Sequence, residues 1–262
     1  MALSRRQQAR LVRIVTIAVP LVVLAAVVVA ADWSAIQQAF FQPEIAADLF
    51  PKIITVGVKN TLIYTTFAFV GGLLIALPIA LLRLSSIKPY RWFAATYIEL
   101  LRGVPAIVTL IAVGFAIPIA LDFRVPGKYG AACLALALVA AAYMAETIRA
   151  GIQAVPRGQT EAARSLGMSP GRTMITIVIP QAFRIMIPPL TNELVLLVKD
   201  SSLVFVLGTT AETVELAKYG REAVSKTFNG TPLTVVAILY LCISLPLTRL
   251  AARLEKRGAP TR

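Results

Sequence analysis

The residues best suited to chemistry in this sequence are two carboxylates inside a largely apolar stretch. Glu193 and Asp200 stand seven positions apart, which is close to two turns of an α-helix, so both side chains project from one face. A charge at membrane depth costs about 2.5 to 3.5 kcal/mol on insertion scales and normally faces a bundle interior or a wet path. Two carboxylates so placed form an anionic site for an ammonium group or a cationic side chain.

A structural role for the same residues is the alternative. Asp200 would then pair with Lys199 or with an arginine of a neighbouring helix, although Lys199 points about 100° away on a regular helix. Asn192, Ser201 and Ser202 are candidate hydrogen-bonding neighbours of a bound ligand. Their alternative role is packing between helices, which is worth about 0.6 to 2 kcal/mol each.

Arg102 is the cationic candidate and lies in the stretch Glu99-Leu-Leu-Arg102-Gly-Val-Pro. It forms either an i,i+3 pair with Glu99 at the membrane edge or, facing the pathway, a contact with the carboxylate of a bound amino acid. Both interpretations stay open, and the first is favoured.

Catalytic machinery is missing from the sequence. It contains no His, which removes the commonest general base and metal ligand. It also contains no G-x-x-x-x-G-K-[ST] phosphate loop, no metal-ligand cluster and no nucleophile–His pair. We therefore expect no enzyme activity, no cofactor and no metal, so any ATP hydrolysis must take place on a separate subunit.

The composition is that of an integral membrane protein. Of 262 residues, 58% are hydrophobic and only 15% are charged, far from the usage of soluble domains. The 26 Lys and Arg exceed the 13 Asp and Glu, but they fall between apolar spans and at both ends, as cytosolic loop charges do. This distribution argues against nucleic acid as a partner. Cys133 and Cys242 lie inside apolar spans, where buried thiols are expected rather than a disulfide.

The apolar runs predict an all-α, polytopic membrane helix bundle of about six spans. Both termini are then cytosolic, and every Lys/Arg-rich loop falls on one face. The first run is expected to be retained as an extra N-terminal helix, with a cleavable signal peptide as the alternative. Pro188-Pro189 should break or bend the fifth span. The predicted spans cover residues 14–31, 55–82, 93–121, 129–149, 170–204 and 233–250, with outer segments at 32–52 and 209–228.

A polar loop interrupts this pattern at residues 151–180. Pro156 and Gly158 should stop the preceding helix. Thr160 is a candidate N-cap, followed by Glu161 in the first turn, and Gly167 can take the left-handed conformation that ends a helix. Ser169-Pro170 would begin the next helix. These signals predict a short helix outside the bilayer, whose small residues Ala162 and Ala163 let a partner approach closely. A basic loop with no partner is the alternative.

This segment resembles the EAA motif of permease subunits of ATP-binding-cassette (ABC) importers. The resemblance rests on Glu161-Ala162-Ala163, on Gly167 four positions later, and on Ile177-Val-Ile179-Pro180, with Ile179 where that family prefers Leu. The stretches AETIRAGIQAVPRGQTEAARSLGMS, PQAFRIMIPPLTNELVLLVKDSSLV and ELLRGVP are similar to the polar amino acid branch, of the histidine/glutamine/arginine type. The similarity runs from about Thr55 to Lys256.

The resemblance implies a five-helix permease core, or type-1 transmembrane domain, at 53–256, with its coupling loop at 151–172. Residues 1–52 would add the basic N-terminal segment, the extra helix and an outer loop, and 257–262 a cytosolic tail. The region around 192–202 would line the translocation path. The coupling residues would be Thr160, Glu161, Ala162, Ala163, Arg164, Ser165, Leu166 and Gly167.

The resemblance also implies partners and a location. The short helix would dock in a groove on an ABC ATPase dimer, beside a second permease copy or a sister permease subunit. An extracytoplasmic binding protein would deliver the amino acid, and the chain would sit in the cytoplasmic (inner) membrane. The substrate would be a polar amino acid, and the paired carboxylates favour a basic one.

Two other classes of membrane protein compete with this interpretation. A secondary amino acid transporter would show inverted repeats and two interrupted helices in matching positions, whereas only the span with Pro188-Pro189 is expected to be broken. A channel-like or purely structural subunit would need rings of charges or carbonyls, which one chain does not display.

Overall fold

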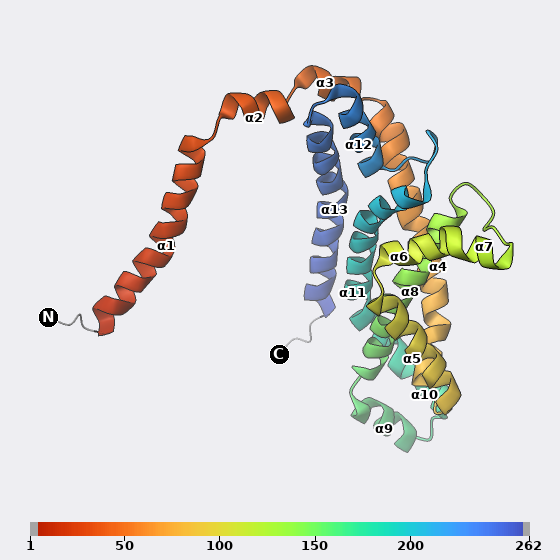
Figure 1. Cartoon of the computed structure of the whole chain (residues 1–262). Helices are drawn as coiled ribbons and strands as arrows, with labels where there is room; N and C mark the ends of the chain where they lie inside the picture. Colours follow the sequence, from red (N-terminus) through yellow and green to blue (C-terminus); the bar gives the residue numbers. More distant parts are fainter. Residues whose placement is uncertain (1–4, 259–262) are drawn as a thin grey trace.

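The computed structural model describes residues 5–258, and these contain helices and connecting segments but no β-strand. The six long helices α1, α4, α5, α8, α11 and α13 are joined by shorter ones (Figure 1). The elements are α1 (Arg5–Ala30), α2 (Trp33–Phe40), α3 (Pro43–Asp48), η1 (Ile53–Val58), α4 (Lys59–Leu84), α5 (Lys88–Gly103), α6 (Ala106–Ile111), η2 (Ala112–Ala116), α7 (Ile117–Leu121), α8 (Gly130–Gln153), α9 (Arg157–Ser165), α10 (Pro170–Thr173), η3 (Met174–Val178), α11 (Ile179–Asp200), η4 (Ser201–Leu207), α12 (Leu216–Thr227) and α13 (Thr231–Gly258).

Four helices in the described part of the chain are long and apolar enough to cross a membrane. They are Arg13–Ala30, Ile53–Leu84, Gly130–Gln153 and Thr231–Lys256. A bent pair, α5 with α6–α7, makes a fifth candidate span. The expected sixth, α11, is less apolar because polar side chains interrupt it, but it packs against α4, α8 and α13 inside the bundle. The all-α helix bundle is therefore confirmed, and α11 belongs to it despite the polar side chains that it carries.

The centre of the bundle is the contact between α4 and α8, and small residues make it possible. A Cβ added at Gly72 would lie 3.1 Å from the Cβ of Ala140 and 3.3 Å from the carbonyl oxygen of Ala137. Half of the residues of α8 are buried, with Ala140, Ala141 and Ala145 fully so. Such residues let helix backbones approach closely in lipid, where dispersion contacts hold helices together.

The break in the membrane helices is not where the sequence predicted it. The expected span 93–121 bends by 109° between α5 and α6, because Val104 before Pro105 is extended (φ −96°, ψ 137°), as residues before proline prefer. By contrast, α11 continues as one helix through Pro188 and Pro189. The prediction of a break there was wrong, while the alternative of a bend stays a prediction. As a whole, α11 packs against α4, α8 and α13.

The N-terminal helix stands away from the bundle (Figure 1), and its apolar window is not buried by the rest of the chain. It is linked through α2 and α3, which are fixed to the start of α13. The backbone N–H of Gly230 donates to Ala39 O at 2.7 Å, and that of Gln42 donates to the Thr231 hydroxyl at 3.0 Å. The expectation of an extra helix outside the core therefore matches this arrangement.

A buried polar network fixes the segment before α12 to α4. Asn60 Nδ2 donates to the carbonyls of Glu212 and Val214, at 2.8 and 2.9 Å. The Tyr64 hydroxyl donates to Thr213 O at 3.0 Å, and the Tyr129 hydroxyl donates to Asn60 Oδ1 at 2.7 Å. This end of the bundle is opposite α9 in Figure 1.

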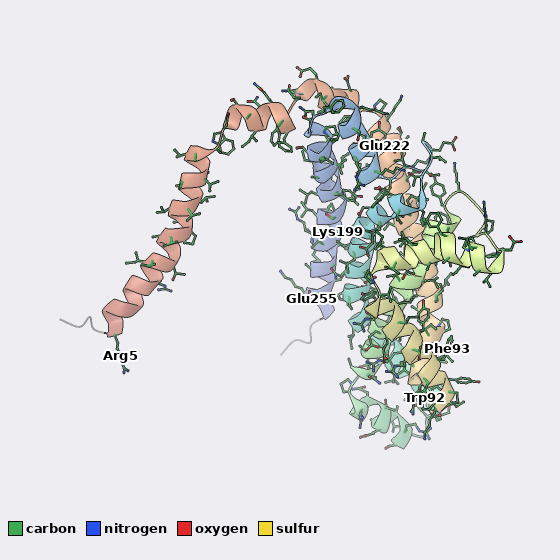
Figure 2. The ribbon with its side chains drawn as sticks, in the orientation of Figure 1. Arg5, Trp92, Phe93, Lys199, Glu222 and Glu255 are labelled. Atoms are coloured by element: carbon green, nitrogen blue, oxygen red, sulfur yellow. The ribbon has the colours of Figure 1, made fainter. Side chains whose placement is uncertain are left out.

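In the view of Figure 1, the lower ends of α1 and α13 point to the same side of the molecule as α9. Figure 2 shows Arg5 and Glu255 at the lower ends of these two helices, and Trp92 and Phe93 at the lower end of α5. Trp92 and Phe93 are largely exposed, and aromatic residues are typical of membrane–water interfaces. The last residues of the expected cytosolic tail, 259–262, lie outside the described residues, as do residues 1–4.

Candidate functional site

Glu193 and Asp200 line one pocket, as their spacing predicted. The pocket, which we call the carboxylate pocket, has a volume of about 190 Å³ and lies between α11, α8 and the bend that joins α5 to α6. Its other walls include Val104, Ala106 and Tyr143. The bend at Val104–Pro105 is therefore what brings a third element to the two carboxylates.

Neither carboxylate has a partner within residues 5–258. Both side chains are half-buried, and neither belongs to an ion pair or accepts a hydrogen bond there. The alternative pairing with Lys199 is not formed; Lys199, labelled in Figure 2, is exposed. Two half-buried carboxylates without a cation are chemically suited to a cationic group.

Three of the predicted neighbours do not join this arrangement. Asn192 lines a different cavity of about 290 Å³ between α11 and α13, together with Thr248 and Glu255. Ser201 is fully buried and its hydroxyl donates to Val198 O at 2.7 Å, so it supports the helix end. Ser202 is half-buried in η4 and does not line the carboxylate pocket.

Arg102 lies beside the pocket, at the end of α5. Its guanidinium carbon is 5.3 Å from the ring centroid of Tyr143, and Tyr143 lines the carboxylate pocket. No ion pair joins Arg102 to Glu99 among the described residues, so the favoured interpretation of this arginine is not what the structure has. Tyr143 itself was missed, because no sequence pattern links it to a helix 50 positions further on.

The short helix predicted in the polar loop is present as α9, but it begins earlier. It starts at Arg157 with Pro156 as the N-terminal capping residue, so Thr160 is not the cap. Pro156 makes no side-chain capping hydrogen bond, and the predicted N-cap was four residues too late in the chain. The helix ends as predicted, at Gly167 with φ +82°, and Ser169 caps α10 by accepting from Arg172 N–H at 3.4 Å.

The two alanines of α9 face different ways, which corrects the predicted small-residue surface. Ala163 is buried against the chain (6% exposed), whereas Ala162 and Glu161 are exposed. Leu166, just after the helix, is 84% exposed. Ala163 therefore anchors α9 to the rest of the chain, and Glu161, Ala162, Ser165 and Leu166 are among the residues that stay exposed.

Comparison with known proteins gives one consistent result. The family described as binding-protein-dependent transport system inner membrane component matches residues 72–259. The arginine transport system permease protein ArtQ of Bacillus subtilis (strain 168) is 34% identical over 202 residues, covering 77% of this chain and 90% of that protein. The glutamine transport system permease protein GlnP of Escherichia coli (strain K12) is 33% identical over 228 residues, covering 86% and 97%.

Solved structures agree with these relatives. The crystal structure of an amino acid ABC transporter with histidines has a chain 37% identical to this one, with a TM-score of 0.73 over 81% of this chain and 96% of that chain. The MetNI methionine ABC transporter, at 22% identity and a TM-score of 0.65, shares the fold. The chain therefore belongs to the family of binding-protein-dependent transport system inner membrane components.

Proposed function

We propose that this chain is the permease subunit of an ABC importer that moves a polar amino acid, preferably a basic one, across the cytoplasmic membrane. The observation that carries the proposal is the carboxylate pocket, in which Glu193 and Asp200 lie half-buried without a cation. An amino acid brings an ammonium group, and a basic one brings a second positive charge. The arginine and glutamine permeases among its relatives support this substrate class.

Arg102 and Tyr143 supply the rest of the proposed site. A guanidinium beside the pocket is suited to the carboxylate of the amino acid, because arginine binds carboxylates through two parallel hydrogen bonds. When no substrate is bound, stacking on the Tyr143 ring would hold the Arg102 guanidinium near the pocket. The site would therefore bind both charged ends of an amino acid.

ATP hydrolysis would take place on a separate ATPase subunit that docks on α9. Leu166 and Ala162 support this docking because they are exposed. An apolar side chain exposed to water is unfavourable, and a docked subunit would cover it. Movement of the ATPase dimer would then shift α9, and with it α8 and α11 on either side. For net transport, the pocket must bind the substrate with different affinity in its two conformations.

The same proposal includes further partners and an orientation of the chain in the membrane. A second permease copy or a sister subunit would complete the pathway, and an extracytoplasmic binding protein would deliver the substrate at the end opposite α9. Both termini would be cytosolic, which is supported by the common side of α9, Arg5 and Glu255 (Figure 2) and by the Lys/Arg distribution.

Uptake by reconstituted vesicles tests the proposal. The permease, its ATPase subunit and the binding protein are incorporated together and assayed against a panel of radiolabelled amino acids. We expect uptake that requires ATP on the ATPase side and the presence of the ATPase, and that is strongest for a basic amino acid. Uptake driven by an ion gradient in vesicles without the ATPase would contradict the proposal and favour a secondary transporter.

A further inference from the structure

A cavity larger than the two described above lies behind α9. It has a volume of about 660 Å³ and is enclosed by the end of α8, by α9 and by the start of the α10–η3–α11 segment. We call it the α9 cavity. Its lining contains two arginines and no Asp or Glu, and apolar side chains such as Val155 and Val178 form its deeper wall. The polar lining residues are Gln153, Arg157, Thr160, Arg164 and Thr173.

Three of these residues share one face of α9. Arg157, Thr160 and Arg164 are spaced i, i+3 and i+7, so they project from the same side of the helix. The Arg164 guanidinium donates to the carbonyl of Met168, which holds it at the mouth of the cavity. Arg157 forms no ion pair in the described part of the chain. The cavity therefore has one guanidinium held in place by a hydrogen bond, that of Arg164, and one without an ion-pair partner among the described residues, that of Arg157.

Thr173 gives an independent sign of a missing ligand. It lines the cavity, is only 2% exposed, and its hydroxyl is one of two buried side-chain polar atoms without a hydrogen bond in residues 5–258. Its neighbour Thr176 makes the usual helical bond to Arg172 O, at 2.6 Å, which Thr173 does not. A buried hydroxyl left unpaired costs about 1 to 3 kcal/mol, and such a group is normally satisfied by water, an ion or a ligand.

The α9 cavity lies on the side of the helix that points away from Ala162 and Leu166, the residues proposed to contact the ATPase. At 100° per residue, Ala162 and Leu166 lie roughly 140° and 180° around the helix from Arg157. An ATPase docked on Ala162 and Leu166 would therefore leave the arginine face uncovered. The arginine face would then remain accessible to a small anion in the assembled complex.

We propose that the α9 cavity binds a phosphate group, supplied either by an anionic phospholipid headgroup of the cytosolic leaflet or by free phosphate. Guanidinium groups bind phosphate oxygens through paired, charge-assisted hydrogen bonds, and basic pockets between membrane helices on the cytosolic side suit lipid headgroups. The inference rests on the proposed function for the cytosolic placement of α9. A phosphate held by Arg157, Arg164 and Thr173 links α9 to α10, and so stiffens the element to which the ATPase is proposed to bind.

The test uses the purified permease–ATPase complex and three permease variants. Inorganic phosphate is titrated by calorimetry in neutral detergent, and retention of phosphatidylglycerol is measured by native mass spectrometry. The double variant Arg157→Ala/Arg164→Ala removes both guanidinium groups, and Thr173→Val removes the hydroxyl while keeping its shape. Arg172→Ala is the matched control, since Arg172 is exposed on α10 and does not line the cavity.

We expect the double variant to weaken binding at least tenfold, Thr173→Val severalfold, and Arg172→Ala not at all. If free phosphate is the ligand, the variants lose affinity in the phosphate titration. If a lipid headgroup is the ligand, they lose only the retention of phosphatidylglycerol. Unchanged binding in the double variant or in Thr173→Val overturns the proposal, as does an equal loss in Arg172→Ala. A double variant that loses only the ATPase subunit also overturns it and assigns the cavity to that subunit. Assembly of the unaltered permease with the ATPase is measured separately. If the unaltered permease does not bind the ATPase, the proposed function fails, whatever the phosphate titration shows.

Discussion

Glu193 and Asp200 are the only charged residues that line the carboxylate pocket in the described part of the chain, so the proposed substrate site depends on them. Replacing Glu193 by Gln and Asp200 by Asn keeps the shape of each side chain and removes its charge. A hydrogen bond to a charged group contributes about 1.5 to 3 kcal/mol, so each variant should bind a basic amino acid roughly 10- to 100-fold more weakly. Substrate-stimulated uptake should be abolished at working concentrations, while assembly with the ATPase stays intact.

Glu222→Gln is the matched control for this pair, because Glu222 is an exposed carboxylate on α12 (Figure 2). Its uptake should equal that of the unaltered protein. Normal uptake in both pocket variants would remove Glu193 and Asp200 from the substrate site.

Gly72 is the residue on which the α4–α8 contact depends. Gly72→Leu would force its Cβ to within 3.1 Å of Ala140 Cβ and 3.3 Å of Ala137 O, and overpacking of this kind typically costs about 1 to 3 kcal/mol. We expect a lower melting temperature in detergent, measured by fluorescence-detected size exclusion. Gly171→Leu is the control, since a Cβ there meets nothing within 4 Å. Equal melting temperatures for the two variants would mean that α4 and α8 do not need close contact.

At the scale of single elements, α9 with Leu166 at its end is the proposed attachment point of the ATPase. Leu166→Asp places a charge on a side chain that is 84% exposed, so the permease itself should fold normally. We expect co-purification of the ATPase to be lost and ATP-dependent uptake to fall in proportion. Phe228→Asp, an equally drastic change at a 93% exposed residue, serves as the control and should leave co-purification unchanged. If Leu166→Asp retained the ATPase at normal yield, the docking surface would have to lie elsewhere.

The helices could largely be predicted from apolar runs and capping residues, but the position of the break could not. Pro105 and Pro188-Pro189 give the same signal within apolar sequence. They differ in backbone conformation, since Val104 is extended before Pro105, whereas the helix continues through both prolines of α11, which packs against α4, α8 and α13. That difference arises from packing between distant segments, which the sequence does not encode locally.

The candidate site was predictable to the same degree. The spacing of Glu193 and Asp200 was enough to place them in one pocket, because both belong to one helix. Tyr143 and Val104 come from other helices, and their approach depends on the α5–α6 bend. Asn192 adjoins Glu193 in sequence, but it faces α13. Helical periodicity therefore predicts residues on one element and fails for residues that separate elements bring together.

At the scale of the whole molecule, the described chain separates into a bundle and a helix that does not touch it. Because the apolar window of α1 is not buried by its own chain and α2 is fixed to α13 by hydrogen bonds, removal of residues 1–31 should not unfold the bundle. We expect the truncated protein to melt within a few degrees of the full chain in detergent. A truncated protein that aggregates in detergent would show that α1 supports the bundle itself.

The bend at Val104–Pro105 has a mechanical consequence for the carboxylate pocket. A pocket walled by straight rods can widen only if the rods slide or tilt as wholes, which disturbs packing along their full length. In this pocket one wall is the bend between α5 and α6. Pro105 lies at the bend and has no backbone N–H, so it has no helical hydrogen bond that a change of the bend angle could break. The wall over Glu193 and Asp200 therefore changes direction at this corner without breaking a helical hydrogen bond of Pro105, so α5 and α6 can meet the pocket at different angles and each remain a regular helix.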